Sequence, residues 1–186
     1  MARQHGITST TYQNLIIDAG AVYANYGIGN EALLGATRGG NKFAIETEYK
    51  DLEVDGAKGP VIGSRIITKV TARLTANFVQ FSTALLKLAL PGSSSANYPT
   101  ISPTHDSITR ALQIVTANFQ GNIALLGQVS GKTYPCVCII KNAICDGNLE
   151  LNEKHADEAV LAIQFTGHFD PSTMDAEPWE IRYPQS

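Results

Sequence analysis

The chain has 186 residues, of which 17% are charged, and a formal net charge of −3. Its length predicts one domain with a core of its own, and its charge gives no basic surface of the kind that nucleic-acid-binding proteins use. No apolar run approaches the roughly 20 residues of a transmembrane helix and the N-terminus lacks a signal-peptide core, so we expect no membrane association and folding in a cytoplasm.

The N-terminal quarter of the sequence predicts an arm, a strand and a loop. Residues 1–12 show no period and are typical of an extended arm that orders on a partner. Alternating apolar residues predict a strand over residues 15–24. Gly27, Gly29 and the pair Gly39-Gly40 then indicate a loop-rich passage.

Residues 43–78 predict two long strands joined by a charged loop. Apolar and polar residues alternate from Phe43 to Lys50, and the apolar parity switches at Leu52 and Val54, which indicates a β-bulge or the end of strand pairing. The glycines and proline of the Asp51–Ser64 segment then predict a loop too long for a tight hairpin.

The second strand, residues 65–78, carries the clearest alternation in the chain. Its polar parity consists of Arg65, Lys69, Thr71, Arg73, Thr75 and Asn77, and its apolar parity of Ile66, Val70, Ala72, Leu74, Ala76 and Phe78. At about 3.3 Å per residue the strand spans roughly 46 Å, far beyond the usual five or six residues. Such a strand predicts an extended sheet surface that neighbouring subunits continue.

The remaining sequence predicts one helix followed by more strands. Ser82 caps a helix over residues 83–90, which Pro91-Gly92 ends, and residues 93–104 are expected to form a loop. Strands are expected near residues 107–119, 122–129, 134–145 and 158–169, and residues 171–186 form a C-terminal tail. The whole chain is therefore predicted to be a single, mainly β domain: an antiparallel β-sandwich or barrel with one short flanking α-helix.

Reactive side chains show no catalytic or metal-binding pattern. Cys136 and Cys138 share one strand face and Cys145 has the opposite parity, a spacing that indicates buried thiols rather than a zinc site. His168 and Asp170 are close enough in sequence to hydrogen-bond, with Ser172 following, but no nucleophile elbow accompanies them.

The other histidines, His5, His105 and His155, are scattered, and neither Gly27–Gly29 nor Gly56–Gly59 has the spacing of a nucleotide-binding loop. We expect no enzyme activity, no cofactor and no metal.

One segment resembles a known family. LGATRGGNKFAIETEYKDLEVDGAKGPVIGSRIITKVTARLTANF, followed by a short helix that ends in Leu88–Gly92, is similar to the tail tube (major tail) proteins of long-tailed, non-contractile bacteriophages. The likeness is strongest over residues 13–92 and returns at Ala162–Asp170.

This resemblance implies a structural virion protein. Its copies would form hexameric rings whose sheets join into a continuous inner β-barrel, and stacked rings would form the tube through which DNA passes into the host. The implied partners are further copies of the chain, a tape measure protein, and tail initiation and terminator proteins. DNA would pass without specific binding, and the protein would be found in the virion after assembly in the host cytoplasm.

Two sets of residues are candidates for assembly and for the bore. We expect the loop over residues 51–64 to contact the next ring, because it combines charges with apolar anchors. Its candidate contact residues are Asp51, Glu53, Val54, Asp55, Lys58, Val61 and Ile62. The candidates for the lumen are Glu46, Glu48, Arg65, Lys69 and Arg73.

Two alternatives share this architecture. One is the inner tube protein of a contractile tail or of a secretion-type injection system. The other is a monomeric β-barrel that binds a ligand, although the dispersed Tyr and Phe residues do not suggest a binding groove.

Overall fold

The computed structural model describes residues 6–8, 10–18, 20–98, 104–151, 155 and 157–185. Within these residues the chain forms one α-helix, α1 (Thr83–Ala89), and two 3-10 helices, Thr11–Asn14 and Thr116–Asn118. The strands are β1 (Ala21–Ala24), β2 (Ala32–Leu33), β3 (Lys42–Asp51), β4 (Arg65–Phe78), β5 (Ser93–Tyr98), β6 (His105–Arg110), β7 (Gln120–Gly127), β8 (Cys136–Cys145), β9 (Leu161–Thr166) and β10 (Trp179–Arg182). The predicted mainly β, antiparallel fold with one short helix is confirmed.

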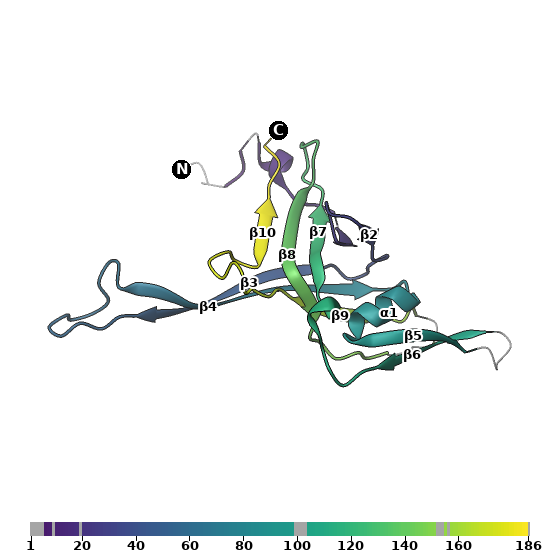
Figure 1. Cartoon of the computed structure of the whole chain (residues 1–186). Coiled ribbons are helices and arrows are strands. Elements are labelled where there is room, and N and C mark those ends of the chain that lie inside the picture. Colours follow the sequence, from purple (N-terminus) through teal and green to yellow (C-terminus); the bar gives the residue numbers. More distant parts are fainter. Residues whose placement is uncertain are drawn as a thin grey trace.

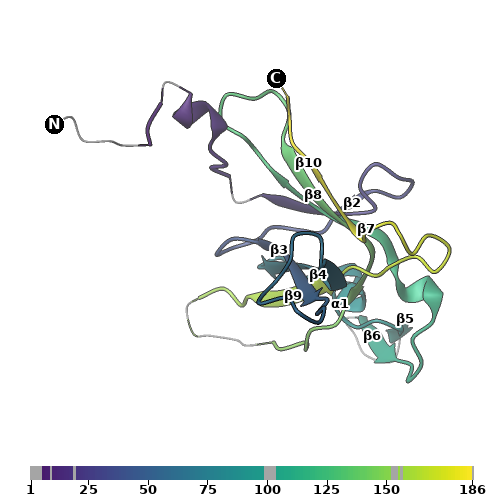
Figure 2. The same ribbon diagram turned by 90° about the vertical axis from the view of Figure 1, so that its left-hand side faces the viewer.

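Two layers share one strand. The main sheet has the order β2-β1-β7-β8-β9-β4-β3, and β10 also pairs with β8. The first part of β8 lies between β7 and β10, whereas its last residues, Ile144 and Cys145, pair with β9. Figure 2 shows the resulting arrangement, with β7, β8 and β10 in one layer and β3, β4 and β9 in the other.

The core fills the space between these layers. Leu74 and Phe78 from β4 meet Ile140 from β8 and Phe165 from β9, and Leu85 of α1 closes one end. All five side chains are almost fully buried. The helix begins as predicted, because the Ser82 side chain accepts a hydrogen bond from the backbone N–H of Leu85.

The turn after β9 requires a glycine. The backbone N–H of Gly167 donates to the carbonyl of Ala72, and a Cβ on Gly167 would lie 2.8 Å from the carbonyl oxygen of Pro178. Three segments therefore meet at this point without room for a side chain, which fixes the C-terminal segment against the sheet.

Two sequence-based predictions of elements are wrong, and the segment predicted as a C-terminal tail contains a strand. The Ser-rich segment 93–98 is not a loop but strand β5, which pairs with β6 in a separate two-stranded sheet. The strand expected over 107–119 ends at Arg110 and is followed by a 3-10 helix. The C-terminal tail contains β10, whose hydrogen bonds come from β8, a partner distant in sequence.

The N-terminal region also differs from the prediction. Only β1 (Ala21–Ala24) forms in the run expected over 15–24, and Ile16 makes an isolated bridge to Val129. A 3-10 helix begins at Thr11, within the segment expected to be an unpatterned arm, and residues 1–5 and 9 of that arm lie outside the described residues. None of the helices formed by the described residues is long and apolar enough to cross a bilayer.

Candidate assembly surfaces

The hairpin of β3 and β4 reaches well beyond the rest of the molecule (Figure 1). Its inner half has one buried face: Ala72, Leu74, Ala76 and Phe78 are buried, and the intervening residues are partly exposed. Its outer half has none, because every residue of Arg65–Thr68 is exposed. The predicted alternation is therefore confirmed for the inner half of β4 only.

A β-bulge separates the two halves. Glu48 pairs with Lys69 but Tyr49 pairs with Ile67, so Thr68 is the extra residue, and its hydroxyl donates to the carbonyl of Glu48. Directly paired residues share a face and neighbours along a strand alternate, so this extra residue exchanges the two faces of β4.

This exchange corrects two sequence-based assignments. Arg65 does not share a face with Lys69 and Arg73, because it pairs with Asp51 on the face that Tyr49 also occupies. Ile66 pairs with Lys50 on the opposite, polar side and is exposed rather than buried. The bulge lies within the strand pair, before the parity switch that the sequence shows at Leu52.

An ion pair ties the base of the outer loop. Arg65 Nε and Nη2 donate to the two carboxylate oxygens of Asp51 at 2.8 and 2.9 Å, and the guanidinium lies 5.7 Å from the ring centroid of Tyr49. The hydrogen bond from Arg65 holds the pKa of Asp51 below its usual value. The tie fixes the point at which the hairpin opens into a loop.

The loop exposes its candidate contact residues. Asp51 is partly buried by the tie to Arg65, whereas the other six candidates are exposed. These are Glu53, Val54, Asp55, Lys58, Val61 and Ile62. Ile62 is as exposed as in an unfolded chain (103%), so the described structure offers it no contact partner.

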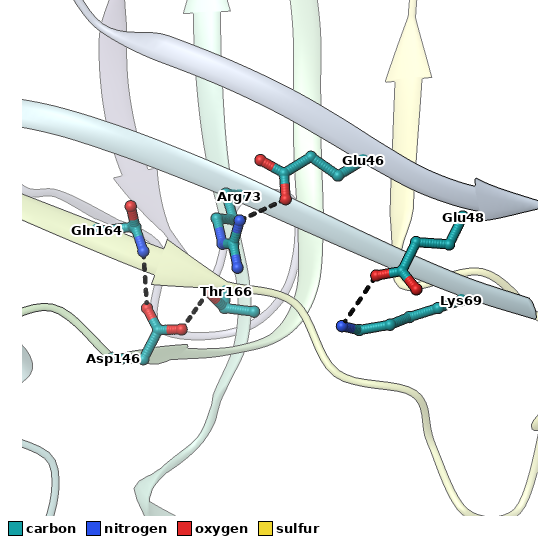
Figure 3. Close-up of polar contacts among 7 residues, drawn as sticks. All are labelled: Glu46, Glu48, Lys69, Arg73, Asp146, Gln164 and Thr166. Carbon is teal, nitrogen blue, oxygen red and sulfur yellow. Dashed lines mark hydrogen bonds and ion pairs between the residues drawn. The ribbon is translucent and has the colours of Figure 1, made fainter.

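The polar face of the inner half brings together four of the five lumen candidates (Figure 3). Lys69 Nζ lies 3.2 Å from a carboxylate oxygen of Glu48, and Arg73 Nη1 donates to the carboxylate of Glu46. Each acid on β3 is therefore neutralised by a base on β4, and the face has no acidic excess at these positions.

The same face continues across β9. Thr166 pairs with Arg73, and its hydroxyl donates to a carboxylate oxygen of Asp146 at 2.6 Å. Gln164 Nε2 donates to the other oxygen of Asp146 at 3.3 Å (Figure 3). The sequence showed Gln164 and Thr166 on one parity of a strand, but nothing in it placed Asp146 beside them.

The cysteines and histidines form no second site in the described residues. Cys136 and Cys145 are buried, and burial, followed by the proximity of Cys136, raises the pKa of Cys138 to about 11. His168 Nδ1 lies 3.1 Å from the carbonyl oxygen of Thr166, while Asp170 accepts from Ser172 instead of from His168. The described part of the chain contains no group of three His, Cys, Asp or Glu side chains that could hold a metal, and His5 lies outside it.

The chain has similarity to solved structures but not to family models or curated sequences. No family model and no curated protein sequence matches it. Among solved structures it is similar to a chain of the six-fold symmetrised baseplate of the anti-feeding prophage, at 12% sequence identity and a TM-score of 0.42. The match covers 81% of this chain and 89% of that chain.

Proposed function

We propose that this chain is a structural subunit of a phage tail, a tail tube protein that polymerises as stacked hexameric rings and conducts DNA into the host. The proposal starts from the sequence resemblance over residues 13–92, the segment that contains β3, the loop, β4 and α1. It includes the absence of enzyme activity and of a bound cofactor.

The outer half of the β3–β4 hairpin is the observation that carries the proposal. Seven apolar side chains are exposed at the end of the β3–β4 strand pair and in the loop that joins the two strands. They are Tyr49, Leu52, Val54, Val61, Ile62, Ile66 and Ile67. At roughly 60 Å² each they would bury about 400 Å² of apolar surface, half of what one partner contributes to a standard protein interface. A monomer gains nothing from this surface, whereas a polymer does.

The loop is the proposed contact between successive rings. Its three acids and Lys58 offer charge complementarity, and Val54, Val61 and Ile62 are apolar anchors for a neighbouring ring. The tie between Asp51 and Arg65 orders the base of the loop before it binds, which lowers the entropy cost of association.

The polar face of β3, β4 and β9 is the proposed wall of the bore. Its ion pairs explain how such a wall lets DNA slide: basic side chains engaged by Glu46 and Glu48 do not neutralise phosphates. Unpaired acids would make a wall that repels phosphate, but Glu46 and Glu48 are each paired with a base. Arg65 is removed from the set of lumen candidates, because it lies on the other face.

The remaining parts of the proposal follow from the tube. Its partners are copies of the chain, a tape measure protein, and tail initiation and terminator proteins, and its location is the virion after assembly in the host cytoplasm. An inner tube of a contractile tail or of a secretion-type system shares this architecture. A sheath protein encoded beside this chain would identify the contractile form.

Electron microscopy of the purified protein tests the proposal. Negative staining, with and without a tail initiation complex, is expected to show hollow rings or tubes with six-fold symmetry in projection. Sedimentation velocity across a hundred-fold concentration range is the companion measurement. Uniform monomers in both measurements under all conditions would contradict the proposal and favour a monomeric ligand-binding β-barrel.

A further inference from the structure

We propose that the outer edge of β3 in one copy pairs, antiparallel, with residues 146–151 of a second copy. These residues, called the seam segment below, follow directly after β8. The inference rests on the proposed function and adds to it the two edges that join.

The first edge is the free side of β3. Its ten residues, Lys42–Asp51, pair with β4 on one side and, among the described strands, with nothing on the other. A long, regular edge with unpaired backbone N–H and C=O groups is a template for another strand, and proteins that do not use such an edge usually shorten, bend or cover it.

The second edge is the seam segment, which follows β8, bends at Gly147 and forms no ladder pair with any of the described strands. The backbone N–H of Asp146 donates to the carbonyl of Gln164 at 3.3 Å, so the segment runs on along β9 beyond the last pair, Cys145 with Phe165. Leu149 packs against the core while Asn148 and Glu150 are exposed, an alternation typical of a strand with one buried face.

Strand directions make these two edges compatible. The pairs β3–β4, β4–β9 and β8–β9 are all antiparallel, so the direction alternates across β3, β4, β9 and the seam segment. The seam segment therefore runs opposite to β3. When a rotation places the next copy beside the seam segment, β3 of that copy continues the alternation of strand direction. Repeating this head-to-tail contact between the seam segment and β3 closes the copies into a ring.

The faces of the two edges match as well. Thr166 and Asp146 lie on the polar face, so Asn148 and Glu150, of the same parity as Asp146, continue that face at the seam. A groove beside the seam segment is lined by its polar-face residues and also by the apolar side chains of Leu90, Ile114 and Leu149. We expect these three apolar side chains to receive the apolar parity of β3.

That apolar parity contains Phe43 and Ile45, which are only partly buried in the single subunit. Pairing at the seam would therefore complete their burial as well as satisfy the backbone groups of both edges.

A lysine and a glutamate define the register to be tested. Among the described residues Lys42 and Glu150 make no ion pair. The register that places Glu150 opposite Lys42 also places Asn148 opposite Ala44, because numbers fall along one antiparallel strand as they rise along the other. Asp146 then lies opposite Glu46. Arg73 balances the charge of Glu46, but within the described structure Asp146 has only the neutral partners Thr166 and Gln164. This pair of acids therefore opposes the register that Lys42 and Glu150 favour.

A disulfide at the seam tests the assignment. Ala44→Cys and Asn148→Cys in the same chain would lie about 5 Å apart across the seam, within the Cα separation that a disulfide spans. Oxidation of assembled protein is expected to give a ladder of covalent species from monomer to hexamer on a denaturing, non-reducing gel, because every copy carries both halves of the bond. Lys42→Cys and Glu46→Cys, each combined with Asn148→Cys, test the registers on either side.

Matched controls remove the competing sources of cross-links. Wild-type protein reports on Cys136, Cys138 and Cys145, and Thr71→Cys with Asn148→Cys places a thiol on the same polar face but on β4, away from the edge. Neither is expected to give a ladder. Charge exchange is the second measurement: Lys42→Glu or Glu150→Lys alone weakens assembly, and the double exchange restores it.

The outcomes separate this inference from the proposed function. Tubes without a ladder at any of the three registers would overturn the edge assignment and leave the tube in place. A ladder that stops at dimers would also overturn it, because it indicates a two-fold contact of like edges. A ladder up to hexamers without tubes would support the edges and count against ring stacking.

Discussion

The two halves of the β3–β4 hairpin share a sequence pattern but differ in what they contact. In the inner half the apolar parity of β4 faces β8, β9 and α1, and Leu74 is fully buried. In the outer half nothing within the described chain lies opposite, and Ile67 remains 55% exposed. Alternation therefore reports that a strand has an apolar face, but whether that face belongs to the fold or to a partner depends on what covers it.

Replacing one apolar residue in each half by aspartate gives the largest expected contrast. Leu74→Asp buries an unpaired carboxylate in the core and is expected to cost more than about 4 kcal/mol, enough to unfold the subunit. Ile67→Asp, on the same face beyond the bulge, is expected to change the free energy of unfolding by less than about 0.5 kcal/mol. Urea unfolding followed by circular dichroism measures both, and similar losses for the two variants would refute the comparison.

Deleting residues 55–59 tests the outer half by its role in assembly. The exposed loop contributes no core contact, so the deletion variant is expected to retain the circular dichroism spectrum and urea midpoint of the full chain. It is expected to form no tubes by negative staining, because the proposed contact between rings is gone. Normal tubes would show that stacking depends on other segments, such as residues 1–12 or the C-terminal segment 171–186.

Adding one methyl group to a glycine extends the comparison to backbone packing. Gly167→Ala would force a Cβ to 2.8 Å from the carbonyl oxygen of Pro178 and is expected to destabilise the subunit by about 2 kcal/mol. At Gly59, in the loop, a Cβ would meet no atom within 4 Å, and Gly59→Ala is expected to be neutral or slightly stabilising. Thermal unfolding distinguishes the two, and equal melting temperatures would argue that the C-terminal segment is not fixed at Gly167.

Reversing the charge of the two acids on the polar face is expected to have a small effect on folding. Glu46→Lys together with Glu48→Lys replaces two exposed ion pairs by like charges, at an expected cost of less than about 1 kcal/mol for each pair. The freed Lys69 and Arg73, with the added lysines, would hold phosphates, so genome ejection by a phage carrying the variant is expected to slow, most strongly at low salt. Glu46→Gln with Glu48→Gln is the milder control. Unchanged ejection at low salt would indicate that this face does not line the bore.

The ion pair between Asp51 and Arg65 predicts the smallest effect, a shift in the titration midpoint of the Asp51 carboxyl group. The pKa of Asp51 is lowered in the folded state, so the tie is present at neutral pH and is lost only as the pH falls through that depressed value. NMR titration of the Asp51 carboxyl carbon is expected to show a midpoint below the usual aspartate range. In Arg65→Gln the midpoint should return to that range; an unchanged midpoint would mean that Arg65 does not hold the carboxylate.

The candidate surfaces were only partly predictable. The loop residues and the polar parity from Lys69 to Asn77 follow from local sequence, since composition and alternation survive in the structure. The partners of Glu46 and Glu48 do not follow from it, because cross-strand pairing depends on register. The seam segment was missed for a similar reason: its strand-like alternation lies in a short stretch after β8 whose position beside β9 is a tertiary contact.

The sequence by itself determined the bounds of β4, the cap of α1 and the mainly β class, because each depends on the order of side chains along a few neighbouring residues. Only the tertiary structure decided that Ser93–Tyr98 and Trp179–Arg182 are strands, since their hydrogen-bond partners are distant or unexpected segments. It also decided the face that Arg65 occupies. One extra residue at Thr68 exchanges the faces of a strand, and that residue is visible only in the register between β3 and β4.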